Sequence, residues 1–157
     1  MVKILKINYE RCTGCRLCEQ ACSVYHENVL NHEKSRIKIV KWEDRGIYVP
    51  LVCRHCEDAK CIKACPTKAL YREPNINAVL IDEEKCMGCK MCITACPFGA
   101  ISFNPDSKKI IKCDLCGGDP QCIQFCDLKA IDYVPAEMVS IDKKRDFASK
   151  IIEEGIF

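Results

Sequence analysis

The sequence predicts an α+β protein in which one short unit, strand, cysteine loop, helix and strand, occurs four times. Three observations predict this fold. Sixteen cysteines fall into four groups of four with none left over, and the groups alternate between two spacings. Short apolar stretches of strand character flank the groups. A β-hairpin inserted after the first group and a helix near the C-terminus complete the expected architecture.

The four cysteine groups use two spacings. In groups I and III the gaps between cysteines are two, two and three residues, whereas in groups II and IV the middle gap expands to four or five. Group I is Cys12, Cys15, Cys18 and Cys22, and group II is Cys53, Cys56, Cys61 and Cys65. Group III is Cys86, Cys89, Cys92 and Cys96, and group IV is Cys113, Cys116, Cys122 and Cys126. Two spacings that each occur twice indicate duplication of one supersecondary unit.

The residues around the cysteines repeat as well. Residues 6–18 (KINYERCTGCRLC) align with residues 80–92 (LIDEEKCMGCKMC). The endings CPTKAL, CPFGAI and CDLKAI begin with the last cysteines of groups II, III and IV, so group IV keeps the ending of the repeat although its middle gap is the longest. Residues 117–121 (GGDPQ) fill that gap, and their glycines and proline predict a turn.

Short strands are expected on both sides of the cysteine loops. Residues 1–8 and 78–82 should lead into groups I and III, and the stretches ALY, AIS and AIDYV should leave groups II, III and IV. Residues 36–50 alternate apolar and polar side chains about a turn at residues 44–46 (DRG), which predicts a β-hairpin between groups I and II.

The C-terminal stretch carries no cysteine and is expected to be helical. Apolar residues recur at helical spacing over residues 140–154, Asp142 can cap the start and Gly155 can close the end. We therefore divide the chain into a cysteine-rich domain, residues 1–135, and a helical extension, residues 136–157. The helix could clasp its own domain or dock a partner, and the sequence does not choose between these two roles.

The composition of the chain and its N-terminal sequence indicate whether the cysteines form disulfides or bind metal. Sixteen of 157 residues are cysteine, about 10%, a level that in a short secreted chain suggests disulfides. The N-terminal MVKILKINYERC lacks the apolar segment and the cleavage site of a secretory signal. No apolar run approaches the roughly 20 residues that cross a bilayer. We therefore expect a cytoplasmic protein, in which dense cysteine usually binds metal.

The charge of the chain excludes one class of partner. A formal net charge of +2 and a pI near 7.8 give no support for nucleic-acid binding, which usually needs a strongly basic patch. Basic residues instead lie close to cysteines, where a positive charge favours the metal-binding thiolate. They are Arg11, Arg16, Arg54, Lys60, Lys63, Lys85, Lys90 and Lys112. Ordinary solvated side chains explain most of them equally well.

The compact spacing is the one with which bacterial ferredoxins bind [4Fe–4S] clusters. Three thiolates on one tight loop hold three corners of a cuboidal cluster, and Gly14 and Gly88 allow the loop backbone to approach closely. Structural zinc is the main alternative, but zinc-binding pairs are usually separated by a dozen or more residues. We therefore expect four [4Fe–4S] clusters. His26, His32 and His55 are not needed as ligands, although His55 could orient a cluster sulfur.

Residues 1–135 resemble the four-cluster iron–sulfur subunits of multisubunit oxidoreductases. The resemblance rests on the alternation of spacings and on CRHCEDAKCIKACP (53–66) followed by KCMGCKMCITACP (85–97). Such subunits serve molybdenum or tungsten enzymes, among them dimethyl-sulfoxide-reductase relatives, formate hydrogenlyase and some aldehyde oxidoreductases, and also carbon monoxide dehydrogenase. The chain departs from the common pattern at Ala59, where a proline often stands, and it lacks a proline after Cys22 and Cys126.

The resemblance implies that the groups pair in a nested way, II with III and I with IV, as two bacterial-ferredoxin-like modules of pseudo-twofold symmetry. One cluster would then be held by Cys86, Cys89, Cys92 and Cys65, and a second by Cys53, Cys56, Cys61 and Cys96. A third would be held by Cys12, Cys15, Cys18 and Cys126, and a fourth by Cys113, Cys116, Cys122 and Cys22. Each module then joins one compact group to one expanded group.

The function expected from these features is electron transfer without catalysis. Four clusters would link the cofactor of a large catalytic subunit to a further redox subunit or a ferredoxin. We favour a tungsten or molybdenum pterin enzyme of the aldehyde oxidoreductase type, because the chain shows no long insertion, membrane anchor or export signal. The alternatives are a free-standing polyferredoxin, a subunit of a formate hydrogenlyase, hydrogenase or carbon monoxide dehydrogenase complex, and a zinc-stabilised interaction module.

Overall fold

The computed structural model describes residues 2–153, apart from the side chains of Asp146, Lys150 and Glu153. Within that part of the chain, eight strands form four antiparallel pairs. The pairs are β1 (Lys3–Ile7) with β8 (Ile131–Pro135), β2 (Lys38–Trp42) with β3 (Ile47–Leu51), β4 (Leu70–Glu73) with β5 (Ala78–Ile81), and β6 (Ile101–Asn104) with β7 (Lys109–Lys112). The α-helices are α1 (Leu17–Glu27), α2 (Lys60–Lys63), α3 (Met91–Ala95), α4 (Gln121–Gln124) and α5 (Ala136–Glu153). Short 3₁₀ turns lie at Tyr9–Arg11, His32–Lys34 and Leu115–Gly118.

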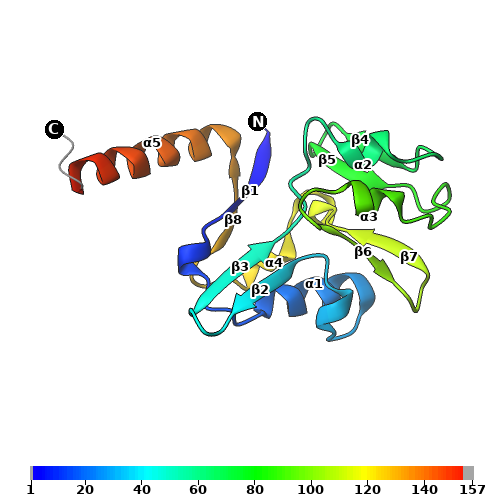
Figure 1. Cartoon of the computed structure of the whole chain (residues 1–157), viewed down its shortest axis with the longest axis horizontal. Helices are drawn as coiled ribbons and strands as arrows, with labels where there is room; N and C mark the ends of the chain where they lie inside the picture. The colour runs from blue at the N-terminus through cyan, green and yellow to red at the C-terminus, as the bar shows by residue number, and fades with distance from the viewer. Residues whose placement is uncertain (1, 154–157) are drawn as a thin grey trace.

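The elements divide into two halves (Figure 1). One half, called the inner half, contains β4 to β7, with α2 packed on α3. The other, called the outer half, contains β1, β8 and the hairpin β2–β3, with α1 packed on α4. The first strand pairs with the last one before α5, from Lys3 opposite Pro135 to Ile7 opposite Ile131. The chain therefore leaves the outer half after group I, builds the inner half with groups II and III, and returns to the outer half with group IV.

Each half has its own buried core, in which aliphatic side chains pack against cysteines. In the outer half, Ile37, Leu115 and Ile131 are among the most deeply buried side chains and pack with Cys18, Cys22 and Cys122. In the inner half, a second buried cluster is formed by Ala59, Leu70, Val79, Cys92, Ile101 and Ile110. Burial of such side chains contributes roughly 1.5–3 kcal/mol each.

The strands expected before group I, after groups II, III and IV, and before group III are confirmed, as is the hairpin between groups I and II. The hairpin turn is closed by Arg45 N–H, which donates to the Trp42 carbonyl at 3.1 Å. One strand was not expected. Residues 109–112 (KIIK) form β7, because the tetrapeptide pairs with β6 across the turn between them, and a four-residue stretch shows too little alternation to be recognised alone.

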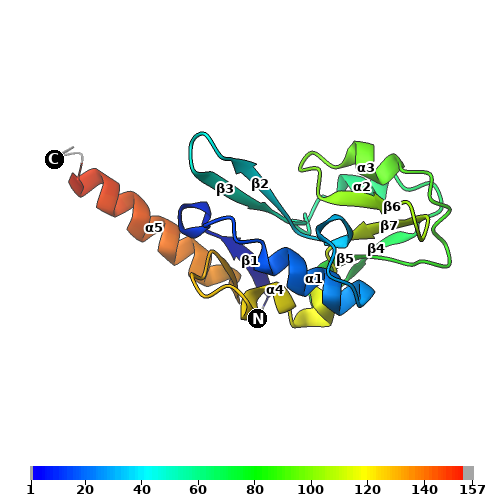
Figure 2. The same ribbon diagram turned by 90° about the horizontal axis from the view of Figure 1, so that it is seen from below.

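The C-terminal helix is confirmed, but its expected start was wrong. Helix α5 begins at Ala136, directly after β8, so Asp142 lies inside the helix and cannot cap it. Asp142 instead forms an ion pair with Lys6 of β1 at 2.5 Å. Beyond that contact α5 projects from the body (Figures 1 and 2), and Phe147 and Ile152 are 67% and 78% exposed. Gly155, the expected end of the helix, lies outside the described residues.

Among residues 2–153, no helix combines the length and the apolar character needed to cross a lipid bilayer. Helix α5 is the longest described helix, at 18 residues, and charged side chains occur along it.

Candidate functional site

The compact loops of groups I and III share one backbone conformation. Gly14 and Gly88 have φ of +70° and +71°, and two residues later Arg16 and Lys90 both have φ of +64°. These left-handed residues turn the chain into α1 and α3, neither of which has a capping side chain. At Gly14 a β-carbon would also lie 2.6 Å from Cδ1 of Tyr48, so the hairpin β2–β3 covers this loop closely.

The expanded loops of groups II and IV also match each other. The second residue after the first cysteine is left-handed in both, with φ of +46° at His55 and +57° at Leu115. Its N–H donates to the sulfur of that cysteine, from His55 to Cys53 at 3.4 Å and from Leu115 to Cys113 at 3.5 Å. Group IV therefore keeps the local geometry of group II despite its longer middle gap.

The loop endings repeat as a turn. In groups II, III and IV the third residue after the last cysteine is left-handed, and its N–H donates to the carbonyl of that cysteine. The pairs are Lys68 with Cys65, Gly99 with Cys96, and Lys129 with Cys126, at 3.3, 3.3 and 2.9 Å. The repeat seen in the sequence is therefore a repeat of backbone geometry.

Three cavities are each lined by four cysteines, three from one group and one from another. A cavity of about 210 Å³ is lined by Cys12, Cys15, Cys18 and Cys126. A cavity of about 270 Å³ is lined by Cys53, Cys56, Cys61 and Cys96. A smaller one, of about 20 Å³, is lined by Cys86, Cys89, Cys92 and Cys65. In each case the structure brings together cysteines that lie far apart in the sequence.

The remaining four cysteines meet where α1 packs on α4. Cys22 lies near the end of α1, Cys122 lies on α4, and both side chains are buried. Burial raises the pKa of the Cys122 thiol, and the neighbouring thiols of Cys113, Cys22 and Cys116 raise it further. The amide of Arg36 donates to the sulfur of Cys22 at 3.3 Å.

The electrostatics of these thiols fit a metal cluster. Burial raises the pKa of Cys18 and of Cys113 to about 12, and the pKa of Cys92 and of Cys116 to about 11. Free thiols with such pKa values are protonated at neutral pH. A cationic metal centre displaces the protons of such thiols, which then become strong ligands.

His55 supplies a buried donor without a protein partner. Its Nδ1 accepts the Val79 N–H at 3.0 Å, so the ring hydrogen lies on Nε2. Nε2 is buried and has no partner among the described residues. Burial lowers the pKa of His55 to about 3, helped by the charges of Lys112 and Arg72. A neutral N–H donor beside cysteine loops suits the sulfur atoms of an iron–sulfur cluster.

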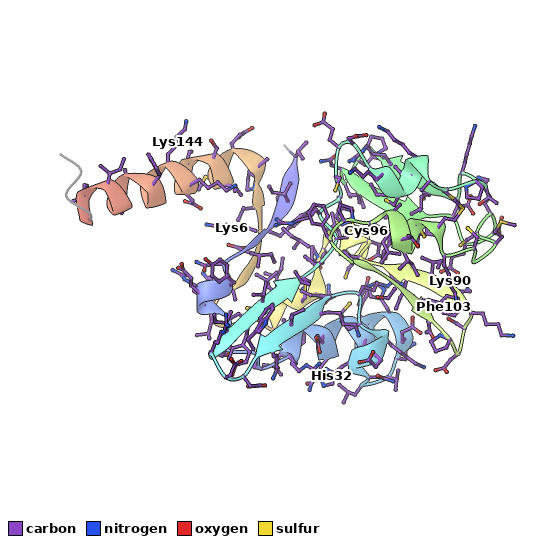
Figure 3. The ribbon with its side chains drawn as sticks, in the orientation of Figure 1. Lys6, His32, Lys90, Cys96, Phe103 and Lys144 are labelled. Carbon is purple, nitrogen blue, oxygen red and sulfur yellow. The ribbon has the colours of Figure 1, made fainter. Side chains whose placement is uncertain are left out.

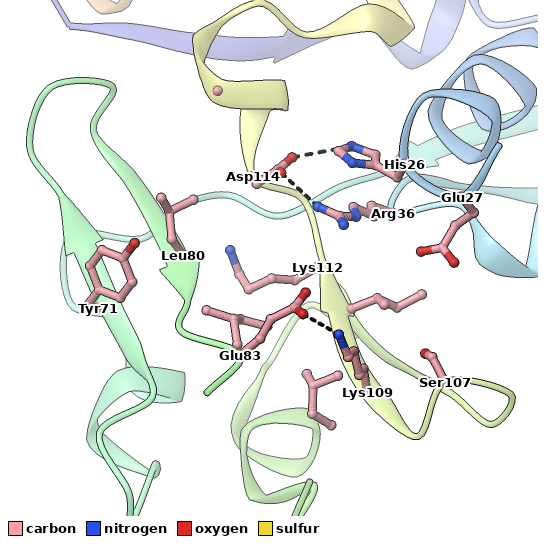
Figure 4. Close-up of a pocket in the computed structure, with 14 residues that line it drawn as sticks. His26, Glu27, Arg36, Tyr71, Leu80, Glu83, Ser107, Lys109, Lys112 and Asp114 are labelled. Atoms are coloured by element: carbon pink, nitrogen blue, oxygen red, sulfur yellow. Dashed lines mark hydrogen bonds and ion pairs between the residues drawn. The ribbon is translucent and has the colours of Figure 1, made fainter. Parts of the chain in front are cut away.

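A second histidine, His26, lies beside Cys116 of group IV and against Asp114, which also pairs with Arg36 (Figure 4 shows Asp114 between His26 and Arg36). His26 Nε2 is 3.6 Å from Cys116 Sγ and 3.4 Å from an oxygen of Asp114, whose other oxygen pairs with Arg36 at 2.8 Å. Burial lowers the pKa of His26. Asp114 was not singled out by the sequence. It connects group IV to α1 and to the segment before β2, which only the fold brings together.

Glu19, next to Cys18, is another residue that the sequence did not indicate. It is fully buried, one of its carboxylate oxygens accepts the Ile39 N–H at 2.6 Å, and the other pairs with Arg16 and His32 at 2.9 Å each. His32 thus contacts the Glu19 carboxylate through Nδ1. The spacing of Arg16 and Glu19, three apart on a helix, was the available signal, but it could not reveal the burial.

The basic residues near cysteines differ in their surroundings. Lys63 pairs with Asp58, and Lys85 pairs with Asp82 at 2.6 Å, both at the surface. Lys90 lies 3.9 Å from the centre of the Phe103 ring (Figure 3). For these side chains a solvated or packing role suffices. Lys112 is different, because it is only 3% exposed.

Comparison with known proteins assigns the family. The description "4Fe-4S dicluster domain" matches residues 44–135, and "4Fe-4S binding domain" matches residues 5–24. The polyferredoxin-like subunit of an aliphatic sulfonate oxidoreductase from Pyrococcus furiosus is 44% identical over 121 residues, 76% of this chain and 69% of that protein. The B subunit of the anaerobic dimethyl sulfoxide reductase of Escherichia coli is 36% identical over 151 residues, 83% of this chain and 72% of that protein.

A solved structure resembles the whole fold. A subunit of the active-site complex BamBC of benzoyl coenzyme A reductase, in complex with zinc, aligns with a TM-score of 0.52 and 26% identity, over 97% of this chain and 98% of that subunit. The resemblance expected from the cysteine spacings is thereby confirmed, and so is the binding of 4Fe–4S clusters. The protein belongs to the 4Fe-4S dicluster domain family and is an electron-transfer iron–sulfur subunit of the kind found in oxidoreductase complexes.

Proposed function

We propose that the chain holds four [4Fe–4S] clusters and conducts electrons between a catalytic subunit and a second redox carrier or subunit. The observation that carries this proposal is the grouping of the cysteines. Three cavities and one buried contact each collect four thiols, three from one loop and one from the partner loop. That three-plus-one arrangement is how bacterial ferredoxins share cysteines between neighbouring clusters.

The ligand sets follow from this grouping. In the inner half, one cluster is assigned to Cys86, Cys89, Cys92 and Cys65, and its neighbour to Cys53, Cys56, Cys61 and Cys96. In the outer half, one is assigned to Cys113, Cys116, Cys122 and Cys22, and its neighbour to Cys12, Cys15, Cys18 and Cys126. All sixteen cysteines are used, and the cysteine-rich domain of residues 1–135 contains them all.

The exposure of the thiols supports a linear order. Cys53 and Cys113 are both buried and belong to one core cluster, so the Cys53 and Cys113 sets lie next to each other at the junction of the halves. Cys15 and Cys89, from the other two sets, are exposed. Electrons would therefore enter near one exposed cysteine, cross the buried junction and leave near the other.

The protein controls the clusters through its own groups. When bound, each cluster accepts and releases one electron, and no bond in an organic substrate changes. The amides of His55 and Leu115 donate hydrogen bonds to cysteine sulfurs, and the side chain of His26 makes a polar contact with Cys116. Hydrogen bonds, local charge and solvent exposure set cluster potentials. Four oxidised clusters change the formal charge of +2 to roughly −6, which also affects docking.

We further propose that the catalytic partner is a tungsten or molybdenum pterin subunit, that the chain works in the cytoplasm, and that residues 136–157 are an extension available for docking. The relatives named above are subunits of oxidoreductases with more than one chain, which supports an assembled role. A free-standing carrier is the second candidate, because one relative, the "Putative electron transport protein YsaA" of Escherichia coli, 38% identical over 147 residues, is named for electron transport and not as a subunit of an enzyme.

Metal analysis of the natively purified protein tests the proposal. About sixteen irons and sixteen acid-labile sulfides per chain are expected, together with co-purification of a large pterin-containing subunit. About eight irons would contradict the four-cluster assignment, and a colourless zinc protein would contradict the cofactor. A brown protein that purifies without partners would favour the free carrier.

A further inference from the structure

Lys112 carries a buried positive charge without a carboxylate partner. It ends β7, immediately before Cys113, and is 3% exposed. Its Nζ donates to the carbonyl of Val79 and, at 2.9 Å, to the carbonyl of Cys113. No carboxylate of the described residues forms an ion pair with it. Because a buried charge is costly unless an opposite charge compensates it, negative charge from another source is expected nearby.

The surroundings of Lys112 place it between two ligand sets. Figure 4 shows its side chain reaching from β7 toward the strand that carries Leu80. On that strand, Val79 accepts from Lys112 through its carbonyl and donates through its N–H to His55, which lies between Cys53 and Cys56. On the other side, Cys113 follows Lys112 directly.

Contacts join this charge to both sets. Val79, whose carbonyl accepts from Lys112, lines the cavity that Cys53, Cys56, Cys61 and Cys96 also line. Cys113, the first cysteine of the other set, accepts from Lys112 through its own carbonyl. Arg72, the other cation near His55, is already used by the carbonyls of His55 and Cys56 and by Asn77.

We propose that the ammonium group of Lys112 raises the reduction potentials of the two clusters at the junction, those of the Cys53 set and the Cys113 set, relative to the two outer clusters. This proposal rests on the four-cluster function proposed above. Each oxidised cluster with its four thiolates bears about two negative charges, which compensate the buried ammonium group. Reduction adds one more negative charge to a cluster, and a nearby cation in a medium of low dielectric constant stabilises that charge.

The electron balance at the junction is simple. One electron would take a bound cluster core from the 2+ to the 1+ state, and its transfer to the neighbouring cluster would restore the 2+ state of the first. No bond and no proton of Lys112 changes in this cycle. The positive charge of Lys112 would favour the reduced state of the two junction clusters.

Substitution of Lys112, followed by redox titration of the complete protein with electron paramagnetic resonance detection, tests this role. Signals are first assigned by their loss in Cys61→Ser and Cys122→Ser. Lys112→Met should lower the potentials of both junction clusters, so that the ratio of reduced to oxidised cluster at a fixed potential falls at least tenfold, about 59 mV for one electron. The outer clusters should stay unchanged. Lys112→Arg should retain the original potentials, and Lys109→Met, an exposed lysine of the same strand, is the matched control.

Lys112→Gln guards against a purely structural effect, because it keeps an N–H donor for the two carbonyls but removes the charge. Unchanged potentials in Lys112→Met or Lys112→Gln with full iron, or an equal shift of all four clusters, would overturn the proposal. If both neutral variants lose the junction clusters, the iron content and the potentials of Lys112→Arg distinguish a requirement for charge from a structural role. Full iron content with wild-type potentials in Lys112→Arg supports a requirement for charge. Loss of iron in Lys112→Arg shows a structural role and overturns the proposal. An iron count below sixteen in the unmodified protein would instead contradict the four-cluster function.

Discussion

Ile7 and Ile131 lie opposite each other in the antiparallel pair of β1 and β8, although one precedes the first cysteine group and the other follows the last. Ile131 is 1% exposed and packs in the core that contains Cys18, Cys22 and Cys122. The pair ties the segment before group I to the segment after group IV. Together with the packing of α1 on α4, it brings group I close to group IV.

Ile131→Ala should weaken the outer half selectively. Removal of a fully buried aliphatic side chain costs about 2–5 kcal/mol. We expect the absorbance of the outer clusters to be lost at lower denaturant concentration, while the inner clusters persist. Leu30→Ala, at a side chain 70% exposed, is the control and should change stability by at most about 0.5 kcal/mol. Simultaneous loss of all clusters would show that the two halves unfold as one unit.

Cys122→Ser should change or remove one cluster and leave the inner pair intact. Cys122 is buried among Cys113, Cys22 and Cys116, so loss of its thiolate removes one of four proposed ligands. The expected iron content falls by about four per chain if the cluster is lost, and the spectra of the inner clusters remain. Unchanged iron content and unchanged spectra would contradict the assignment of group IV.

Gly14→Ala should be more damaging than Gly88→Ala. Both residues have positive φ, where alanine costs roughly 1–2 kcal/mol. At Gly14 a β-carbon would also meet Tyr48 at 2.6 Å, and overpacking of this kind typically adds about 1–3 kcal/mol, whereas at Gly88 the nearest atom is 3.6 Å away. The rate of cluster loss under air measures the difference. Adding Tyr48→Ala should rescue Gly14→Ala in part, and no rescue would locate the damage in the backbone alone.

The attachment of α5 should not depend on pH near neutrality. A hydrogen bond from Lys6 lowers the pKa of Asp142. The pair is therefore complete above the ordinary aspartate pKa of 3.8 and weakens only as the pH falls through the lowered value of the folded state. Hydrogen exchange in the first turns of α5 should be alike at about pH 6 and pH 8, after correction for the intrinsic exchange rate. Asp142→Asn should raise that exchange at both pH values, and Glu137→Gln is the control on the same helix. Equal protection in Asp142→Asn would show that Lys6 does not secure the helix.

Local features of this protein could be predicted from its sequence because short-range geometry controls them. The spacing within KCMGCKMC indicates a tight loop, since the thiols of one cluster must come from a few residues of chain. The hairpin at 36–50 and the strands beside the cysteines follow from alternation and turn residues. The C-terminal helix was also expected, although its start was not, because the four residues after β8 carry no capping signal.

Only the tertiary structure decided which loops meet. The spacing of groups III and IV differs little from that of groups II and III, and the pairing of β1 with β8 is a contact between chain ends that no local pattern encodes. The burial of individual side chains was also decided only by the tertiary structure. Lys112 and Lys85 both precede the first cysteine of a group, yet one is buried at the junction and the other pairs with Asp82 at the surface. The local sequence determines how each loop can bind a cluster, whereas tertiary packing determines which charged side chains surround that cluster.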